Sequence, residues 1–372
     1  MQVASADFDI VIVGAGMAGV SIAHALAPSR SVLLLEAEPQ PGYHATGRSV
    51  AFWNESYGGP GVQPLTTASG DFLRQPPAQF SDTAFMHHRG ALHIGRNDDR
   101  PLAARLIADF AETTLSFEQL PPEKISAQIP GLRAGWDIGV YEHGCYDIDV
   151  AALHAAYLRG ARHGGAVLQT STALHRAKFG RGLWQIEAGG ETFSARLLIN
   201  AAGAWADMVA QLSGIAPTGI TPLRRTVVQL ATDPAPPADL PLILGLDGSF
   251  YFKADPAGRI WLTPHDETPS APCDAAAEEI DIATAIDRFS KVVDWRVAKV
   301  EHSWAGLRSF APDRLPVIGH DPANEHFFWL AGQGGFGIQT APASAQLAAS
   351  LITGDQTAPA GVDPARYAPN RF

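Results

Sequence analysis

The sequence predicts an α/β fold in which a Rossmann-like nucleotide-binding domain carries a second domain built on an antiparallel sheet. Two observations lead to this fold class. A glycine fingerprint lies between a β-branched run and a helix-compatible segment in residues 8–36. Further along, runs typical of antiparallel strands lie between parallel βα pieces, so the chain leaves the nucleotide-binding domain and returns to it twice.

The first element is a strand at residues 10–13, because its β-branched residues suit a strand buried on both faces of a parallel sheet. Gly14, Gly16 and Gly19 follow it in the spacing G-x-G-x-x-G. They allow, in order, a tight turn, close approach of a pyrophosphate, and close packing of a helix on the strand. The alternative interpretation is a glycine-rich turn in another α/β protein.

A helix and a second strand complete this unit. The mostly apolar segment after the glycines extends to residue 27, and its first backbone N–H groups would face the phosphates of a nucleotide. A second apolar run at residues 32–35 ends in Glu36, where an acid is expected to bind a ribose hydroxyl. Strand, glycines, helix, strand and acid in this order predict a dinucleotide-binding site.

The rest of the chain yields further elements. They are a loop at 42–51, a strand at 86–95, a helix at 150–163, short strands at 167–168, 184–187 and 192–195, a buried strand in 197–206, strands in 223–230 and 249–264, and a strand, glycine-rich turn and helix in 329–352. Asp149 is expected to cap the helix at 150–163. Alternation along the strand at 86–95 places Arg89, Ala91 and His93 on one face.

Composition limits the class of protein. The 372 residues are 46% hydrophobic and 17% charged, as in an ordinary globular protein, and suffice for two domains. A net charge of −11 argues against nucleic acid or an anionic membrane as a partner. The only cysteines, Cys145 and Cys273, exclude a disulfide framework and fit a reducing compartment. Without a signal-like start or a long apolar run, we expect a cytoplasmic protein with no transmembrane segment.

Several motifs together resemble a known family. They are the fingerprint with Glu36, the loop "GYHATGRS", the strand "NAAGAWA", the segment "WAGLRSFAPDRLPVIG" and the turn "GQGGFGIQTAP". In this order they are similar to the FAD-dependent D-amino acid oxidase and glycine oxidase family, and within it to bacterial D-arginine dehydrogenase. The resemblance implies an FAD-binding Rossmann-like domain of the glutathione-reductase type and a substrate-binding domain with an antiparallel sheet. The expected limits are 1–82, 146–218 and 303–372 for the FAD-binding domain, and 83–145 and 219–302 for the substrate-binding domain.

The resemblance also implies which residues contact FAD. They are Gly14, Gly16, Met17, Ala18, Gly19, Glu36, Ala37, His44, Thr46, Gly47, Arg48, Ser49, Val167, Ala202, Gly203, Trp205, Gly306, Gly334, Gly335, Phe336, Gly337, Ile338 and Gln339. Relatives that bind FAD covalently use a cysteine shortly after the arginine of "GLRSF", and none lies there in this chain. We therefore expect noncovalent FAD.

Arg308 is the main candidate for substrate binding. It lies among apolar neighbours, where a guanidinium needs an anion, and the resemblance makes that anion the substrate carboxylate. The alternative is a structural salt bridge. Tyr57, beside a Gly-Gly-Pro stretch suited to a lid, and Tyr251 match two tyrosines of the relative's substrate site. Arg224 and Arg225 point to opposite faces of a strand, so only one can reach the site. The resemblance favours Arg225 as a second carboxylate contact; the alternative is one surface arginine and one arginine in a structural pair, and the choice stays open.

The side-chain pocket departs from that of D-arginine dehydrogenase. Ala91 stands where the relative has the acid that pairs with the substrate guanidinium, and Phe52 replaces a polar histidine. With Leu244 and Gly335 these residues predict an apolar pocket for the substrate side chain. Because His93 lies on the same face as Ala91, a substrate with a polar or acidic side chain is the alternative. Loss of the acid removes several kcal/mol of pairing with a cationic substrate.

The predicted activity is oxidative deamination of a D-amino acid with an apolar side chain, giving an imino acid and then a 2-oxo acid. The alternatives are a glycine- or sarcosine-type amine oxidase and an FAD-binding partner protein without turnover. The electron acceptor, oxygen or a quinone, stays open.

His87, His88 and His93 alternate in direction, which is unsuited to a shared metal, so no metal is predicted. Lys253 shares a face with Tyr251; by default we expect an exposed lysine, and the alternative is a position near the flavin.

Overall fold

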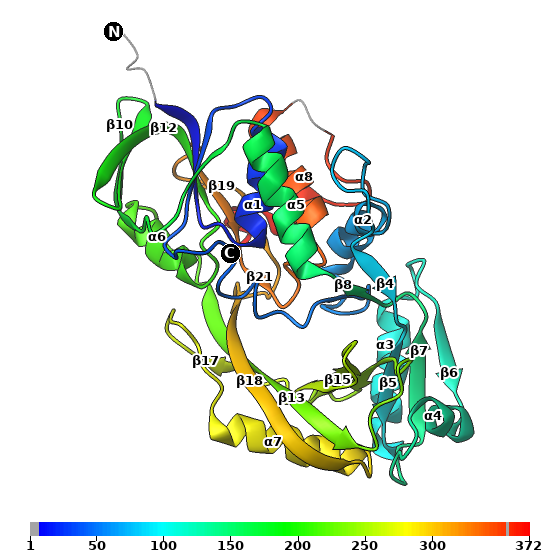
Figure 1. Cartoon of the computed structure of the whole chain (residues 1–372). Helices are drawn as coiled ribbons and strands as arrows, with labels where there is room; N and C mark the ends of the chain where they lie inside the picture. The colour runs from blue at the N-terminus through cyan, green and yellow to red at the C-terminus, as the bar shows by residue number, and fades with distance from the viewer. Residues whose placement is uncertain (1–6, 355–356) are drawn as a thin grey trace.

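A computed structural model describes residues 7–354 and 357–372 and contains two large sheets joined by a small one (Figure 1). The first sheet has the order β10–β11–β12–β1–β2–β9, with β20 beside β12 and β19 beside β20. Its strands are β1 (Phe8–Val13), β2 (Val32–Leu35), β9 (Val167–Gln169), β10 (Leu174–Gly180), β11 (Leu183–Ala188), β12 (Glu191–Asn200), β19 (Val317–His320) and β20 (Phe327–Ala331). Because β1 is parallel to both β2 and β12, its carboxyl end opens at the centre of the sheet.

Helices cover both faces of this sheet, as a buried parallel sheet requires. On one face lie α1 (Met17–Leu26), α5 (Val150–His163) and α8 (Ala341–Thr353), with α2 (Gln63–Arg74) against α8. On the other face lies α6 (Ala206–Leu212). Alternation along β1 decides which side chain faces which layer: Ile10 and Ile12 pack toward α1, Val11 and Val13 toward α6.

The second sheet is mostly antiparallel and has the order β21–β18–β13–β16–β15–β14–β5–β7–β6, with β17 beside β13. Its strands are β5 (Ala91–Gly95), β6 (Phe117–Leu120), β7 (Ile138–Glu142), β13 (Thr221–Asp233), β14 (Leu242–Gly245), β15 (Tyr251–Ala254), β16 (Ile260–Thr263), β17 (Thr268–Pro269), β18 (Arg296–Phe310) and β21 (Gln333–Gly334). The long strands β13 and β18 pair from Thr221 beside Phe310 to Asp233 beside Arg296. They reach up to the first sheet in Figure 1.

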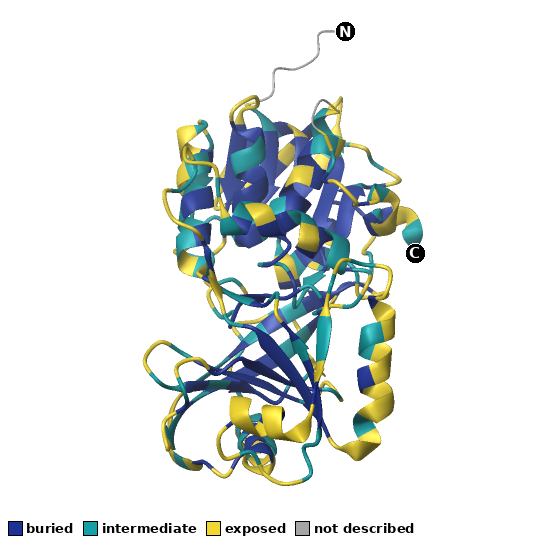
Figure 2. Cartoon of the chain, turned by 90° about the vertical axis from the view of Figure 1, so that its right-hand side faces the viewer, coloured by how far each residue is buried: buried dark blue, intermediate teal, exposed yellow. Residues whose placement is uncertain are grey.

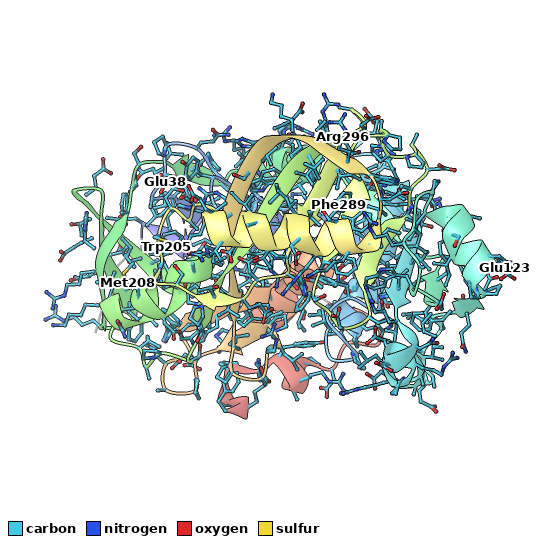
Figure 3. The ribbon with its side chains drawn as sticks, turned by 90° about the horizontal axis from the view of Figure 1, so that it is seen from below. Glu38, Glu123, Trp205, Met208, Phe289 and Arg296 are labelled. Carbon is cyan, nitrogen blue, oxygen red and sulfur yellow. The ribbon has the colours of Figure 1, made fainter. Side chains whose placement is uncertain are left out.

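Two helices pack on the outer face of the second sheet, α7 (Glu279–Val292) and α4 (Pro122–Gln128). Figure 3 shows α7, with Phe289, lying across the sheet. The other face is packed by α3 (Arg100–Asp109) only near β5 and β7, where Ala103 meets Val140. In Figure 2 the strands of both sheets are dark, whereas the outward sides of the helices are exposed. The inner face of the second sheet therefore remains available for a site.

A small antiparallel sheet joins the two halves. It contains β3 (Phe52–Trp53), β8 (Tyr146–Ile148) and β4 (Met86–His88) in the order β3–β8–β4. Short 3-10 helices complete the element set: η1 (Asn97–Asp99), η2 (Gly203–Trp205), η3 (Pro364–Tyr367) and η4 (Pro369–Arg371). Within the described residues, no helix is both long and apolar enough to cross a bilayer.

The predicted fold class is confirmed, and some predicted strands differ from the structure. The strands predicted at 192–195 and in 197–206 are one strand, β12, which ends at Asn200. The helix at 150–163 forms with the expected limits, and Asp149 accepts a hydrogen bond from the Ala152 N–H at 2.9 Å. The predicted strand at 86–95 is two strands, β4 and β5, in different sheets. Gly90 breaks it with a φ of +79°, and a Cβ there would lie 2.0 Å from the Tyr141 hydroxyl oxygen.

This break changes the direction of one side chain. Arg89 does not share a face with Ala91 and His93; its guanidinium pairs with Asp147 of β8 at 2.5 Å. The predicted domain division at residue 303 falls inside β18, and the domain limits stay a prediction.

Candidate active site

At the carboxyl end of β1, the glycine fingerprint lets the backbone at Gly14 pack closely against the backbone at Ala201. Gly14 has a φ of +101°, and a Cβ there would lie 2.6 Å from the carbonyl oxygen of Ala201. The Met17 N–H, at the start of α1, donates to Thr46 Oγ1 at 3.0 Å. Glu36 is fixed at the end of β2 because it accepts from the Ala15 N–H at 2.8 Å. Amides and a carboxylate thus surround one side of a space suited to a nucleotide.

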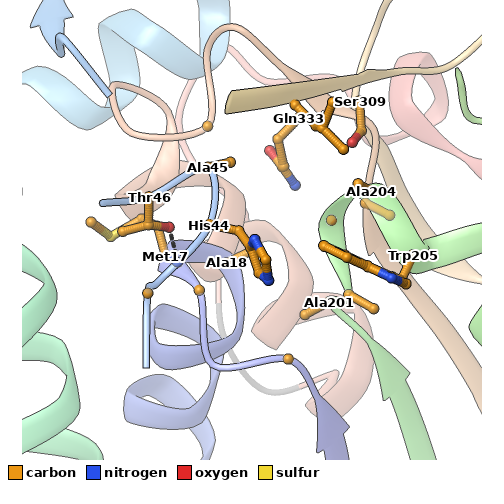
Figure 4. Close-up of a pocket in the computed structure, with 18 of the residues that line it drawn as sticks. Met17, Ala18, His44, Ala45, Thr46, Ala201, Ala204, Trp205, Ser309 and Gln333 are labelled. Carbon is orange, nitrogen blue, oxygen red and sulfur yellow. Dashed lines mark hydrogen bonds between the residues drawn. The ribbon is translucent and has the colours of Figure 1, made fainter. Parts of the chain in front are cut away.

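That space is a cavity of about 380 Å³ that continues from the first sheet to the second. Figure 4 shows His44 and Trp205 beside it; the centroids of their rings lie 4.6 Å apart. Most of the residues predicted to contact the cofactor line it: Gly14, Gly16, Met17, Ala18, Glu36, Ala37, His44, Thr46, Arg48, Ser49, Ala202, Gly203, Trp205, Gly306, Gly334, Gly335, Gly337 and Ile338. The others do not line it: Gly19, Gly47, Val167, Phe336 and Gln339.

The sequence did not point to Thr172, Leu174 and Cys273, which also line this cavity. Thr172 and Leu174 enter from beside β9 and from β10, and neither belongs to a recognisable motif. Cys273 lies in the loop before α7, which is tied to the loop at 42–48 because Arg48 Nη1 donates to the Ala275 carbonyl at 2.8 Å. This cysteine is exposed, whereas Cys145 is buried.

Arg308 of β18 lies at the inner end of the cavity, between two tyrosine hydroxyls. Its Nη1 donates to Tyr57 at 2.8 Å and its Nη2 donates to Tyr251 at 3.0 Å. Burial lowers the pKa of Arg308, but Tyr57 and Tyr251 raise it by more. Among the described residues, no carboxylate forms an ion pair with this guanidinium, so the alternative of a structural salt bridge finds no partner there.

Arg225 is the member of the Arg224–Arg225 pair that faces the site. Arg224 points outward and pairs with Asp281 of α7 at 3.0 Å. Arg225 is 3% exposed; its Nε donates to the Asp266 carbonyl at 2.7 Å, and its Nη2 pairs with Glu267 at 3.0 Å. Its Nη1 is buried without a hydrogen-bond partner among the described residues. Burial and the charge of Arg308 lower the pKa of Arg225.

A second, much smaller cavity of about 10 Å³ adjoins Arg308. Its lining includes Phe52, Tyr57, Tyr251 and Gly335, and its volume matches roughly one water molecule. Gly335 is required because a Cβ there would lie 2.7 Å from Arg308 Nη1. The ring of Phe52 contacts both tyrosines, with centroids 4.9 Å from Tyr57 and 5.5 Å from Tyr251. Little room is left beside the guanidinium.

Ala91, His93 and Leu244 lie on the inner face of the second sheet, and Phe52 belongs to β3 of the small sheet. Leu244 pairs with His93 on one side and with Tyr251 on the other. Ala91, Leu244 and Phe52 belong to one buried apolar cluster with Tyr251. Phe52 lines the small cavity beside Arg308 and Gly335 lines both cavities, whereas Ala91, His93 and Leu244 line neither. That these residues bind the substrate side chain stays a prediction.

Beside Ala91, on the same face of the sheet, lies a carboxylate that the sequence did not indicate. Glu142 of β7 pairs directly with Ala91 and is 2% exposed. It accepts a 2.6 Å hydrogen bond from the Ser56 hydroxyl and lies 3.7 Å from His93 Nε2. Burial raises the pKa of Glu142, but His93 and Ser56 lower it by more, so the pKa lies below the ordinary value.

His265 was also missed, because nothing distinguishes it within the turn after β16. It has a φ of +54°, a strained value for a residue other than glycine. Its Nδ1 lies 2.5 Å from the Gly248 carbonyl and its Nε2 lies 3.4 Å from the Tyr57 hydroxyl. Burial and the charges of Arg225 and Arg308 lower the pKa of His265 to about 3.

Lys253 is buried, contrary to the expectation of an exposed lysine. Its ammonium pairs with Asp147 at 2.6 Å and donates to the Ala51 carbonyl at 3.3 Å. Since Asp147 also binds Arg89, these groups connect the small sheet to the second sheet. The position of Lys253 is thus structural.

In the described part of the chain, no group of three or more His, Cys, Asp and Glu side chains is placed to hold a metal ion.

The sequence also matches a family of known proteins over most of its length. The family model for "FAD dependent oxidoreductase" matches residues 9–351. Glycine oxidase of Pseudomonas aeruginosa is 27% identical over 97% of this chain and 98% of its own length. Mitochondrial dimethylglycine dehydrogenase of Mus musculus is 24% identical over 89% of this chain, which spans only 40% of that relative.

Solved structures show the same fold. The crystal structure of glycine oxidase from Geobacillus kaustophilus superposes with a TM-score of 0.86 at 20% identity, covering 99% of this chain and 100% of that one. L-proline dehydrogenase from P. horikoshii gives 0.85 at 20% identity, covering 98% and 97%.

Proposed function

Because the chain belongs to the family of FAD dependent oxidoreductases, we propose that it oxidises the amine of a small α-amino acid. The Cα–N single bond becomes an imine, and water then hydrolyses the imine to a 2-oxo acid and ammonia. The observation that carries the proposal is the pair of guanidiniums, half-buried Arg308 and buried Arg225, at the inner end of the cofactor cavity. The D configuration is proposed from the family resemblance alone.

The cofactor is FAD, and the residues present fit it. The amides at the start of α1 suit a pyrophosphate, and Glu36 suits a ribose hydroxyl. The cavity extends from these groups to Gly306 and Gly335 on the far side, where only backbone lines it at these two positions and a flat ring can approach closely. When bound, FAD supplies the two-electron acceptor for the Cα–H bond of the substrate.

The chain's own residues bind and orient the amino acid. A carboxylate placed at Arg308 gains two parallel N–H donors, and Arg225 contributes the free Nη1 beside them. Tyr251 accepts from Arg308, and its own proton has no acceptor among the described residues, so it is free to bind the same carboxylate. Phe52 and Tyr57 exclude water from the reacting carbon. Holding the amino acid in this way supplies much of the catalysis.

The size of the space beside Arg308 favours small substrates. If the substrate side chain enters the cavity of about 10 Å³ bounded by Phe52, there is room for a hydrogen or a methyl group but not for a long side chain, which favours glycine, sarcosine or D-alanine. D-arginine is disfavoured further because Ala91 offers no charge and Glu142 is already bound to Ser56. A glycine- or sarcosine-type amine oxidase is accordingly the second candidate, and the similarity to glycine oxidase supports it.

Anaerobic reduction of the flavin tests the proposal. The purified holoprotein is mixed with glycine, sarcosine, dimethylglycine and D- and L-alanine, leucine, proline and arginine, and bleaching of the flavin is followed by stopped-flow absorbance. We expect glycine, sarcosine and D-alanine to bleach the flavin quickly and D-arginine to bleach it slowly. Bleaching by none would favour the third candidate, an FAD-binding partner protein without turnover. Addition of oxygen or of a quinone to the reduced protein then identifies the acceptor.

A further inference from the structure

His265 and Tyr57 form a chain of hydrogen bonds whose direction is fixed. The Gly248 carbonyl can only accept, so His265 Nδ1 carries the proton that binds it. Nε2 of the neutral ring is then an acceptor, and the Tyr57 hydroxyl donates to it across 3.4 Å. Arg308 Nη1 donates to the same hydroxyl oxygen. The proton of Tyr57 thus points away from Arg308 and toward His265.

Tyr57 and Tyr251 therefore differ, although both bind Arg308. The Tyr251 proton is free to bind a ligand, whereas the Tyr57 proton is directed to His265 and the Tyr57 oxygen keeps one lone pair for the site. Burial raises the pKa of Tyr57, but Arg308 and Arg225 lower it by more, so its hydroxyl gives up a proton more readily than an ordinary tyrosine. His265 is only half-buried, which leaves its ring close to solvent.

We propose that Tyr57 and His265 relay a proton from the substrate ammonium group to solvent, a role that rests on the proposed amino acid oxidation. An ammonium N–H bond breaks and its electron pair stays on nitrogen. The proton passes to the Tyr57 oxygen while the Tyr57 hydroxyl proton passes to His265 Nε2, and from there to water. The neutral amine that results is the form whose lone pair assists loss of hydride from Cα. His265 acts through Tyr57 and is a positioning residue.

The charges around His265 make the relay depend on substrate binding. The titratable and charged groups around it include Arg225, Arg308, Arg314, Tyr57 and Tyr251, and Glu267 lies between Arg225 and Arg314. Arg288 of α7 also lies close, because it donates to the carbonyls of Pro264 and Ser249. In the free protein burial keeps the ring neutral, and the charges of Arg225 and Arg308 add to this effect. A bound carboxylate compensates these charges, so protonation of His265 becomes easier when the proton has to be taken up.

The first test compares pH profiles of anaerobic flavin reduction by glycine, sarcosine and D-alanine. His265→Asn keeps an amide donor for Gly248 and tolerates the positive φ, but removes the base. We expect His265→Asn and Tyr57→Phe to slow reduction tenfold to a hundredfold near pH 7. Both should approach the wild-type rate at about pH 10, where the amine arrives neutral. The double variant should lose no more than either single variant.

His163→Ala, an exposed histidine at the end of α5, is the control and should follow the wild-type profile. An equal loss for His265→Asn at every pH would assign His265 a purely structural role and overturn the relay. Rates that match wild type throughout, or losses that multiply in the double variant, would overturn it as well.

The second test needs no turnover. Acetate stands in for the substrate carboxylate, and the His265 ring is titrated by ¹⁵N NMR in histidine-labelled holoprotein, with His265→Asn assigning its signals. We expect saturating acetate to raise the pKa of His265 by about one pH unit or more. An unchanged pKa, or an ordinary pKa before acetate is added, would contradict the relay. Absence of flavin reduction by every amino acid in wild-type protein would instead reject the proposed function.

Discussion

The carboxylate of Glu142 lies 2.6 Å from the hydroxyl oxygen of Ser56, so that a strand of the second sheet holds the loop that carries Tyr57. The other side of this loop is held by Gln339, which accepts from the Asn54 N–H at 3.2 Å and donates to the Tyr57 carbonyl at 3.1 Å. The residue that covers Arg308 is thus fixed by two elements far apart in the sequence.

Removing this contact should loosen the loop. We expect Ser56→Ala to raise KM for the amino acid more than it lowers kcat, and to lower the free energy of unfolding by about 1–3 kcal/mol, because Glu142 loses a buried donor. Steady-state kinetics and urea unfolding measure the two effects. Ser290→Ala removes a hydroxyl from exposed α7 and is the control. An unchanged KM would show that Glu142 does not position Tyr57.

Lowering the pH should weaken the contact between Glu142 and Ser56. The pKa of folded Glu142 lies below its ordinary value, because His93 and Ser56 outweigh burial. The contact therefore contributes its full stability above the ordinary pKa and loses it as pH falls through the depressed pKa of the folded state. We expect the difference in the free energy of unfolding between wild type and Glu142→Gln to shrink as the pH is lowered below the ordinary pKa of glutamate. A difference that grows in acid would contradict the assignment.

Arg308 should be essential for reduction and dispensable for FAD. Arg308→Met removes the guanidinium at the inner end of the cavity, and we expect a loss of roughly hundreds-fold or more in the flavin reduction rate, or about 3–5 kcal/mol. FAD should remain bound, as measured by the absorbance ratio of flavin to protein. Arg224→Met is the matched control, because the neighbouring arginine faces α7 and not the site. Near wild-type reduction by Arg308→Met would make Arg308 structural.

A new acid at position 91 should favour cationic substrates only in a suitable background. Ala91 pairs directly with buried Glu142, so Ala91→Glu alone would place like charges opposite each other. We expect the double variant Ala91→Glu, Glu142→Gln to raise the kcat/KM ratio of D-arginine to D-alanine several-fold over wild type. An unchanged ratio in a folded double variant would show that the substrate side chain does not reach β5.

FAD should leave the denatured protein. Acid precipitation should release the flavin into the supernatant, where absorbance quantifies it, because no cysteine lies shortly after Arg308. Flavin that stays with the precipitate would contradict the noncovalent prediction. Cys273→Ser would then be the first variant to examine, since this exposed cysteine lines the cavity.

The sequence by itself determined the nucleotide-binding unit. The glycines from Gly14 to Gly19 and the acid Glu36 act through local geometry, a turn, a helix start and a strand end, and such geometry is encoded by neighbours in the chain. The helix at 150–163 was predictable for the same reason. The family resemblance added Arg308, Tyr57 and Tyr251, which the structure brings together, although their roles remain proposals.

Only the tertiary structure decided the rest of the site. Whether Arg224 or Arg225 faces inward depends on the register of β13 with β18, and Gly90 ends a strand because the Tyr141 hydroxyl occupies the place of its Cβ. Glu142 and His265 lie in segments without a motif. They reach the site because sheet pairing and loop packing bring distant residues together, and those contacts leave no periodicity or spacing in the sequence.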